Sequence, residues 1–161
     1  MTNLFRFTAN LTWAVEPVQS DGREGTDRRL RGFPLRVLVA EDATDNLLLI
    51  RAFLKDYPWR IDSAANGRIA LEKAMTASYD LILMDLDMPE MDGYAATRKI
   101  RIAECSNEMP AVPIVALTAH NDAEAALKSI EAGCTAHVTK PIHKAALIKT
   151  IQRYTAPRRA G

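Results

Sequence analysis

Five short runs rich in aliphatic and β-branched residues lie between residues 35 and 140, and segments with helical spacing separate them. The runs are LRVLVA (35–40), WRIDSA (59–64), DLILMD (80–85), VPIVAL (112–117) and TAHVTK (135–140). Strands that alternate with helices are typical of βαβ units, whose strands pair in parallel. The first, third and fourth runs are the most continuously apolar, as expected of central strands covered on both faces. The sequence therefore predicts an α/β fold, a doubly wound five-stranded parallel sheet with five helices.

The segments between the runs carry both the spacing and the end signals of helices. Apolar residues recur every three or four positions at Leu47, Ile50, Leu54 and Tyr57, and again at Leu147, Ile151 and Tyr154. Asn66 and Asn121 stand where N-caps belong, and Pro58 is expected to stop the first helix. Gly133 is suited to a left-handed position at a helix C-terminus. Sheets of this class bind ligands at the carboxyl ends of their strands, so function is expected there.

Residues 1–34 do not follow this alternation of strands and helices. One half-buried strand is predicted within residues 1–15, where apolar and polar side chains alternate: Phe5, Phe7, Ala9, Leu11, Trp13 and Val15 are apolar, and Arg6, Thr8, Asn10 and Thr12 are polar. Residues 16–34 are rich in charge and glycine, as linkers are, and residues 156–161 form a tail expected to be solvated. A single strand is not stable alone. We therefore expect residues 1–15 to be the last strand of a preceding domain, or an arm that packs on the main domain or on a second copy.

Composition and charge exclude several classes of function. The net charge is +1 and no stripe of Lys and Arg interleaves with aromatic residues, so no nucleic-acid partner is expected. No apolar run approaches the roughly 20 residues of a transmembrane helix, so we expect no direct contact with a membrane. Cys105 and Cys134 have neither metal-ligand spacing nor the density of a disulfide scaffold. A cytoplasmic chain that binds another protein or a small molecule is the expectation.

Carboxylates gather where the predicted strands end. Glu41 and Asp42 follow the first run, Asp85 closes the third, and Asp87 comes two residues later. In the flavodoxin-like strand order 2-1-3-4-5 the first and third strands are neighbours, so these side chains meet at one edge of the sheet. Like charges at such close range are unfavourable unless a cation is present. Mg²⁺, a hard ion that prefers oxygen ligands, is the predicted cofactor.

A hydroxyl group and an ammonium group belong to the same edge. Thr118 follows the fourth run and Lys140 ends the fifth. Carboxylates, a cation, a lysine and a hydroxyl together suit phosphoryl transfer, which relies on positioning and on neutralising charge over the phosphoryl oxygens. A carboxylate in such a group can itself be the nucleophile and form an aspartyl phosphate. Asp85 is the predicted nucleophile, because it ends a strand whose apolar neighbours hold it in place.

The motifs at the strand ends, taken in order, resemble those of the receiver domain of two-component response regulators. They are VLVAED (37–42), LILMD (81–85), MPEMDG (88–93), ALTA (116–119) and TKP (139–141), and the resemblance covers residues 35–155. It implies that Asp42 binds Mg²⁺ directly and that Glu41 does so through water. It also implies that Asp85 and the main-chain carbonyl of Asp87 are further metal ligands.

The same resemblance assigns the phosphoryl chemistry. It implies that Asp85 accepts a phosphoryl group from a phosphohistidine and that Thr118 and Lys140 bind the phosphoryl oxygens, with Thr118 as the switch hydroxyl. The reaction then consists of the phosphorylation and dephosphorylation of Asp85 itself, followed by a change of conformation.

Three other positions gain meaning from the family pattern. His137 lies three residues before the lysine, where the family commonly carries a Tyr or Phe that swings inward on phosphorylation. Asp87 and His120 lie two residues past the phosphoacceptor and two past the switch hydroxyl, at positions that tune dephosphorylation in the family. We therefore assign His137 to the switch, and Asp87 and His120 to the lifetime of the phosphoryl group.

The N-terminal segment extends the resemblance. LFRFTANL (4–11) resembles the closing strand of the ATP-binding domain of a histidine kinase, which in hybrid kinases precedes a linker and a receiver. This similarity predicts the receiver of a hybrid histidine kinase, in the cytoplasmic part of a sensor. The expected partner is a histidine kinase or a histidine phosphotransfer protein, with the kinase core of the same polypeptide as a further one.

Two other interpretations stay open. DLD (85–87) is similar to the DxD nucleophile motif of haloacid-dehalogenase-type phosphatases, which also use a Thr, a Lys and Mg²⁺. In those enzymes the acidic pair follows the DxD motif, whereas Glu41 and Asp42 precede it here. The second is a degenerate receiver that acts only as a docking module, and His137 is the reason to keep it.

Overall fold

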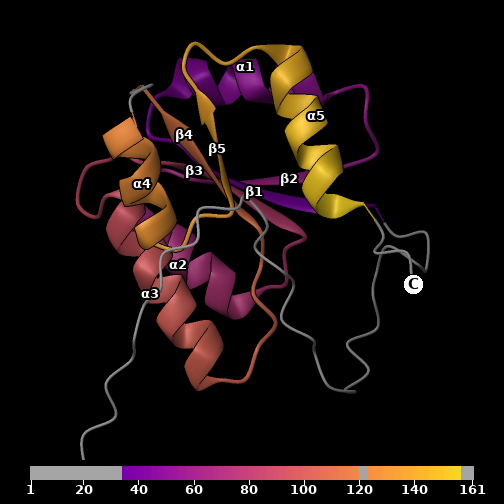
Figure 1. The fold of residues 1–161 in the computed structure, drawn as a ribbon. Helices are drawn as coiled ribbons and strands as arrows, with labels where there is room; N and C mark the ends of the chain where they lie inside the picture. The colour runs from indigo at the N-terminus through magenta and orange to yellow at the C-terminus, as the bar shows by residue number, and fades with distance from the viewer. Residues whose placement is uncertain (1–33, 120–122, 157–161) are drawn as a thin grey trace, which may run out of the picture.

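The computed structural model describes residues 34–119 and 123–156, in which one sheet lies between two groups of helices (Figure 1). The strands are β1 (Arg36–Ala40), β2 (Arg60–Ala64), β3 (Leu81–Asp85), β4 (Ile114–Thr118) and β5 (Ala136–Thr139). All neighbours pair in parallel, in the order β2-β1-β3-β4-β5. The predicted sheet and its strand order are confirmed. The strand and linker predicted in residues 1–33 and the tail from residue 157 lie outside the described residues.

Five helices connect and cover the strands. They are α1 (Thr44–Leu54), α2 (Gly67–Thr76), α3 (Gly93–Ser106), α4 (Ala123–Glu131) and α5 (Lys144–Thr155). Figure 1 shows α1 and α5 on one face of the sheet and α2, α3 and α4 on the other. Val37, Leu83 and Val115 pack with apolar side chains of α1 and α5, whereas Leu38 and Ile82 pack with those of α2 and α3. Burial on both faces explains why β1, β3 and β4 read as unbroken apolar runs.

Two of the predicted helix signals act as expected. The side chain of Asn66 accepts a hydrogen bond from the Ile69 amide at 2.8 Å and so caps α2. Gly133 lies just past the end of α4 and has a φ of 104°, in the left-handed region. Its amide donates to the carbonyl of Ile130, in the last turn of α4. Asn121, the other predicted cap, lies outside the described residues.

Two element boundaries differ from the prediction. The first helix ends at Leu54, four residues before Pro58, because the chain already turns there with the Tyr57 amide donating to the Leu54 carbonyl. The fourth strand starts at Ile114, the residue after Pro113, and continues to Thr118. Proline has no N–H to donate to a ladder, although the Pro113 carbonyl still accepts a hydrogen bond from the Ile82 amide of β3 at 2.9 Å. Thr118 therefore ends β4 rather than following it.

The two cysteines are both free thiols. Cys105 is exposed and Cys134 is buried. Burial raises the pKa of the Cys134 thiol, and the Thr97 hydroxyl, 3.9 Å from its sulfur, offsets part of that rise. Within the ranges described, none of the helices has the length and apolar character needed to cross a membrane.

Arg101 of α3 ties three segments together near the amino ends of the strands. Its Nε donates to the Gly133 carbonyl at 2.9 Å, and its Nη2 donates to the Val112 carbonyl at 2.9 Å. Its Nη1 lies 2.6 Å from Glu104 Oε2, and Glu104 Oε1 accepts from the Val112 amide at 2.8 Å. The Glu104 side chain is only 6% exposed, so its charge is compensated almost entirely by these partners.

Replacing Arg101 with Met should lower the free energy of unfolding by about 3–5 kcal/mol, because the Glu104 carboxylate would stay buried without its counterion. Urea unfolding of the two chains measures the difference. Arg68→Met is the matched control, since its ion pair with Glu72 has side chains more than half exposed and should contribute little to the free energy of unfolding. Equal losses in the two variants would contradict the role given to Arg101.

Candidate functional site

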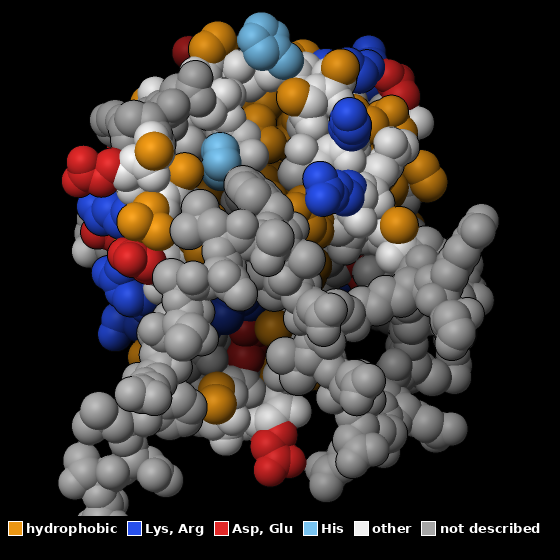
Figure 2. All heavy atoms as spheres, in the orientation of Figure 1, with side chains coloured by type: hydrophobic (Ala, Val, Ile, Leu, Met, Phe, Trp, Pro, Cys, Tyr) orange, Lys and Arg blue, Asp and Glu red, His pale blue; other side chains and the backbone are white. Residues whose placement is uncertain are grey.

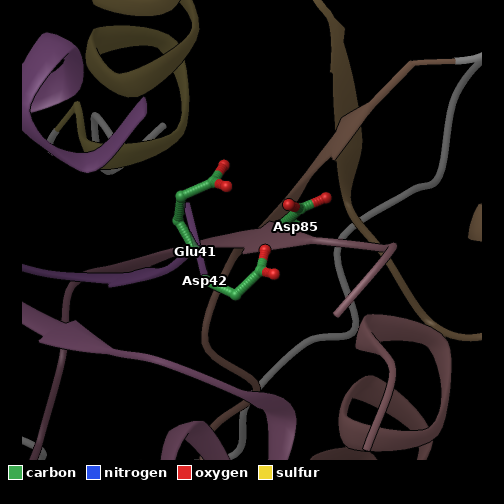
Figure 3. Close-up of side chains that lie close together, drawn as sticks. All are labelled: Glu41, Asp42 and Asp85. Carbon is green, nitrogen blue, oxygen red and sulfur yellow. The ribbon is translucent and has the colours of Figure 1, made fainter. Parts of the chain in front are cut away.

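Glu41, Asp42 and Asp85 come together at the carboxyl edge of the sheet, where Figure 3 shows their side chains beside one another. They meet because β1 and β3 are neighbours, with Ala40 paired to Met84, so the next residue of each strand lies at the same level. An oxygen atom of each carboxylate lies within 4.8 Å of an oxygen of both others. Glu41 and Asp85 are buried, whereas Asp42 is exposed. We call these three side chains the acidic group.

Lys140 reaches the acidic group from the end of β5. Its Nζ lies 2.8 Å from Asp85 Oδ2 and 3.0 Å from Glu41 Oε2. Its main-chain amide donates to the Thr118 carbonyl at 2.7 Å, which ties the residue after β5 to the last residue of β4. Thr118 is buried. The edge of the sheet therefore holds Lys140 and Thr118 side by side along the main chain, as the order of the strand ends predicts. Figure 2 shows one face of the molecule as spheres, in the orientation of Figure 1.

The two carboxylate oxygens of Glu41 have different surroundings. Oε1 accepts hydrogen bonds from the Ala43 amide and from Asn46 Nδ2, both at 3.2 Å. Oε2 is fully buried and accepts no hydrogen bond in the described part of the chain, since its contact with Lys140 is an ion pair without hydrogen-bond geometry. Asn46 is a residue that sequence reasoning missed. Its one signal is an amide side chain in the first turn of the helix that starts directly behind the acidic pair.

The acidic group carries more negative charge than Lys140 neutralises. Burial raises the pKa of Asp85, and the nearby Glu41 adds to the rise. Hydrogen bonds from Lys140 and from the Asp87 amide, which donates to Asp85 Oδ1 at 3.2 Å, lower that pKa without cancelling the rise. For Lys140 burial lowers the pKa, but the favourable interactions of its ammonium group with the carboxylates of Asp85 and Glu41 outweigh the burial and leave the pKa raised. Both directions are those expected when buried carboxylates share one lysine ammonium group.

This arrangement fits a divalent cation with oxygen ligands. The donors are carboxylate oxygens, which suit hard cations such as Mg²⁺ and Ca²⁺ better than soft ones. Glu41 Oε2 is buried and its one described partner is the ion pair with Lys140, so a divalent cation would compensate the carboxylate charge that a single ammonium group leaves unbalanced.

For Asp87, His137 and His120, the structure does not test the predicted roles. The Asp87 side chain is exposed, and the Asp87 amide donates to Asp85. His137 is exposed on β5 and pairs with Ala116 of β4. His120 lies outside the described residues. The roles given to these three residues therefore stay predictions.

A family model for the response regulator receiver domain matches residues 37–152. The chain therefore belongs to the family of response regulator receiver domains. It is a receiver domain of two-component signalling, and the phosphatase interpretation of the DLD motif loses its support.

The curated relatives place this receiver among those of histidine kinases. The chain is 38% identical over 120 residues to the sensor histidine kinase GacS of Pseudomonas protegens, which covers 74% of the chain and 13% of GacS. It is 35% identical over 123 residues to the histidine-protein kinase BarA of Escherichia coli, covering 74% of the chain and 13% of BarA. The match thus spans only 13% of the length of each of these relatives.

Two solved structures are informative about sites and partners. The receiver domain of sensor histidine kinase PA1611 of Pseudomonas aeruginosa has a magnesium ion coordinated in its active-site cleft. It is 35% identical, with a TM-score of 0.69, and the match covers 77% of this chain and 99% of that one. A match of 32% identity and TM-score 0.73 comes from the complex of the Saccharomyces cerevisiae histidine phosphotransfer protein Ypd1 with the Ssk1 receiver domain, covering 76% and 89% of the two chains.

Without a divalent cation, Asp85→Asn should be more stable than the parent chain near neutral pH. The folded-state pKa of Asp85 lies above its ordinary value of 3.8, so the parent should lose stability as the pH rises from about that value through the folded-state pKa. The variant lacks this loss, and the two chains should converge in acid. Urea unfolding across pH measures the effect, with Asp56→Asn as control, since Asp56 is an exposed carboxylate paired with Lys144. A parent that is the more stable chain at neutral pH would refute it.

Proposed function

We propose that this receiver domain accepts a phosphoryl group on Asp85 from a phosphohistidine of a partner protein. The observation that carries the proposal is the position of the Asp85 carboxylate. It is buried at the end of β3, with the Lys140 ammonium 2.8 Å from Oδ2 and the carboxylates of Glu41 and Asp42 beside it. Such a carboxylate is fixed, close to a cation and surrounded by groups that handle phosphoryl charge.

Mg²⁺ is the cofactor that we assign to the acidic group. Glu41, Asp42 and Asp85 would hold it, together with the main-chain carbonyl of Asp87. When bound, the ion supplies positive charge that neutralises the carboxylates and polarises the phosphoryl oxygens. Support comes from the three carboxylates of the acidic group, which face the single ammonium group of Lys140, and from the magnesium ion in the active-site cleft of the PA1611 receiver.

Each residue of the site then has its own role in the phosphoryl transfer. An oxygen of Asp85 attacks phosphorus, the new O–P bond forms as the P–N bond breaks, and the electron pair of the P–N bond stays on the histidine nitrogen. Lys140 stands beside the attacking carboxylate and neutralises charge on the phosphoryl oxygens. The Thr118 hydroxyl binds another of these oxygens. Glu41, held by Ala43 and Asn46, keeps the cation site in place.

The switch follows from how β4 and β5 are joined. Thr118 ends β4, and its carbonyl accepts a hydrogen bond from the amide of Lys140. A phosphoryl group that attracts the Thr118 hydroxyl would displace the end of β4. Ala116 of β4 pairs with His137 of β5, so the displacement would reach the exposed imidazole, and we assign His137 to the switch on this ground.

The partner that we propose is a histidine kinase or a histidine phosphotransfer protein. Receivers related to this chain occur in sensor kinases, and one forms a complex with a histidine phosphotransfer protein. We propose that residues 35–155 are the receiver domain of a hybrid histidine kinase and that this segment lies in the cytoplasm. In that organisation, residues 1–15 close a kinase ATP-binding domain, residues 16–34 form the linker and residues 156–161 are a tail.

Incubation with acetyl phosphate and Mg²⁺ should add the mass of one phosphoryl group to the full chain, as measured by intact mass spectrometry. The gain should require Mg²⁺ and should be absent from Asp85→Ala. Asp56→Ala is the matched control, because this exposed carboxylate lies outside the acidic group and should leave the gain unchanged. Absence of any gain, together with absence of Mg²⁺ binding, would overturn the proposal in favour of the docking module.

The lifetime of the aspartyl phosphate should depend on Asp87 and His120, which lie two residues past the phosphoacceptor and the switch hydroxyl. In the double variant Asp87→Asn, His120→Ala we expect the decay rate to change by about a hundredfold, the lower end of the effect that a positioned proton-transfer group has on a reaction. Mass spectra taken over time after removal of acetyl phosphate give the rate. An unchanged decay in the double variant would refute the assignment without affecting that of Asp85.

A further inference from the structure

The turn that follows the phosphoacceptor strand is closed by main-chain hydrogen bonds. Met91 donates its amide to the Pro89 carbonyl at 2.8 Å, and Gly93 donates to the Leu86 carbonyl at 3.0 Å. We call residues 89–93 the β3–α3 turn. Gly93 is also the first residue of α3, so the turn passes directly from the end of the site into a helix.

On one side, this turn touches the main chain of the phosphoacceptor itself. A Cβ added at Gly93 would overlap the Asp85 carbonyl oxygen and would lie 2.8 Å from the Leu86 Cα. Both neighbours are backbone atoms, which have no rotamer to change. The N-terminus of α3 therefore sits against Asp85 with no room between them, and only glycine fits there.

On its other side, the β3–α3 turn touches the start of α2. The Gly67 amide donates to the Met91 carbonyl at 3.0 Å. A Cβ added at Gly67 would overlap that same carbonyl oxygen and would lie 2.9 Å from both the Asp92 carbonyl oxygen and the Ala96 Cβ. Gly67 is buried, and the N-cap of Asn66 fixes the helix end that carries it. The turn thus contacts Gly67 on one side and, through its own Gly93, the main chain of Asp85 on the other.

We propose that Gly67 is a positioning residue for Asp85, acting through this continuous stack of main-chain contacts. The inference rests on the proposed function. A methyl group at position 67 must displace either α2 or the β3–α3 turn, and the turn has no clearance from Asp85 on its far side. The displacement therefore reaches the phosphoacceptor and the Asp87 carbonyl that follows it. Gly67 itself contributes no atom to the chemistry.

The test compares Gly67→Ala with Gly133→Ala in the full 161-residue chain. Gly133 is a matched control, because it has a φ of 104° and an added Cβ would lie 2.8 Å from Arg101 Cγ, away from the β3–α3 turn. Both variants should unfold at lower temperature than the parent. Only Gly67→Ala should weaken Mg²⁺ binding, by about tenfold. It should also slow phosphorylation by acetyl phosphate, per folded molecule, by about tenfold or more.

Several results would overturn the inference. Gly67→Ala with the Mg²⁺ affinity and phosphorylation rate of the parent would show that the glycine matters only for stability. An equal loss of Mg²⁺ affinity in Gly133→Ala would show that the effect is not specific to the turn. A parent chain that takes no phosphoryl group would overturn the proposed function and this inference with it, whereas the first two results leave the proposed function standing.

A measurement on the parent chain covers the case in which Gly67→Ala does not fold. If the packing of Gly67 affects the ion, the ion must affect Gly67 equally, because coupling between two sites is reciprocal. In an NMR titration with Mg²⁺, the Gly67 amide should shift with the same saturation curve as the Asp87 amide, and the Gly133 amide should stay unchanged. A Gly67 amide that does not respond while Asp87 does would overturn the inference.

Discussion

The ion pairs from Lys140 to Asp85 and Glu41 are the interaction on which the functional edge of the sheet depends. They join the residue after β5 to the ends of β1 and β3, across the width of the central sheet. Leaving a buried carboxylate without its counterion costs on the order of 3–5 kcal/mol, and both Asp85 and Glu41 are buried. Lys140 therefore stabilises two buried carboxylates at this edge of the sheet, but its single positive charge does not balance the negative charge of the acidic group.

The remaining imbalance of charge connects structure to function. Asp42 adds a third carboxylate to the group, and the raised pKa of Asp85 reflects both its burial and the charge of Glu41. Whatever binds this edge and brings positive charge stabilises the folded state by an amount that grows with its concentration relative to its dissociation constant. A divalent cation would meet that need, and under the proposed function it would also share with Lys140 the negative charge that a phosphoryl group on Asp85 adds. The carboxylate charges that destabilise the fold thus favour the binding of a cation at this edge.

Much of this edge could be predicted from the sequence, because apolar runs show where buried strands end and a parallel sheet places those ends together. Glu41, Asp85 and Lys140 can be found in this way. Asn46 and Arg101 cannot, since each reads as an ordinary polar residue on a helix. Their roles depend on which direction the helix faces and on partners such as Val112 that come from other elements. The local sequence pattern predicts where strands end, whereas the contacts of Asn46 and Arg101 form only when the helices pack against the sheet.

Under the proposed function, the site combines a fixed nucleophile, the carboxylate of Asp85, with the mobile ammonium group of Lys140. Asp85 has a short side chain at the end of a strand whose main chain is confined by Gly93, and its carboxylate also accepts a hydrogen bond from the Asp87 amide. Lys140 carries its ammonium on a flexible four-carbon stem, while its main-chain amide holds it to the end of β4. Phosphorylation of Asp85 would move negative charge outward from its carboxylate to the oxygens of the phosphoryl group. If Lys140 follows that charge while Asp85 stays in place, the hydrogen bond from the Lys140 amide to the Thr118 carbonyl would carry the movement to the ends of β4 and β5 rather than to β3.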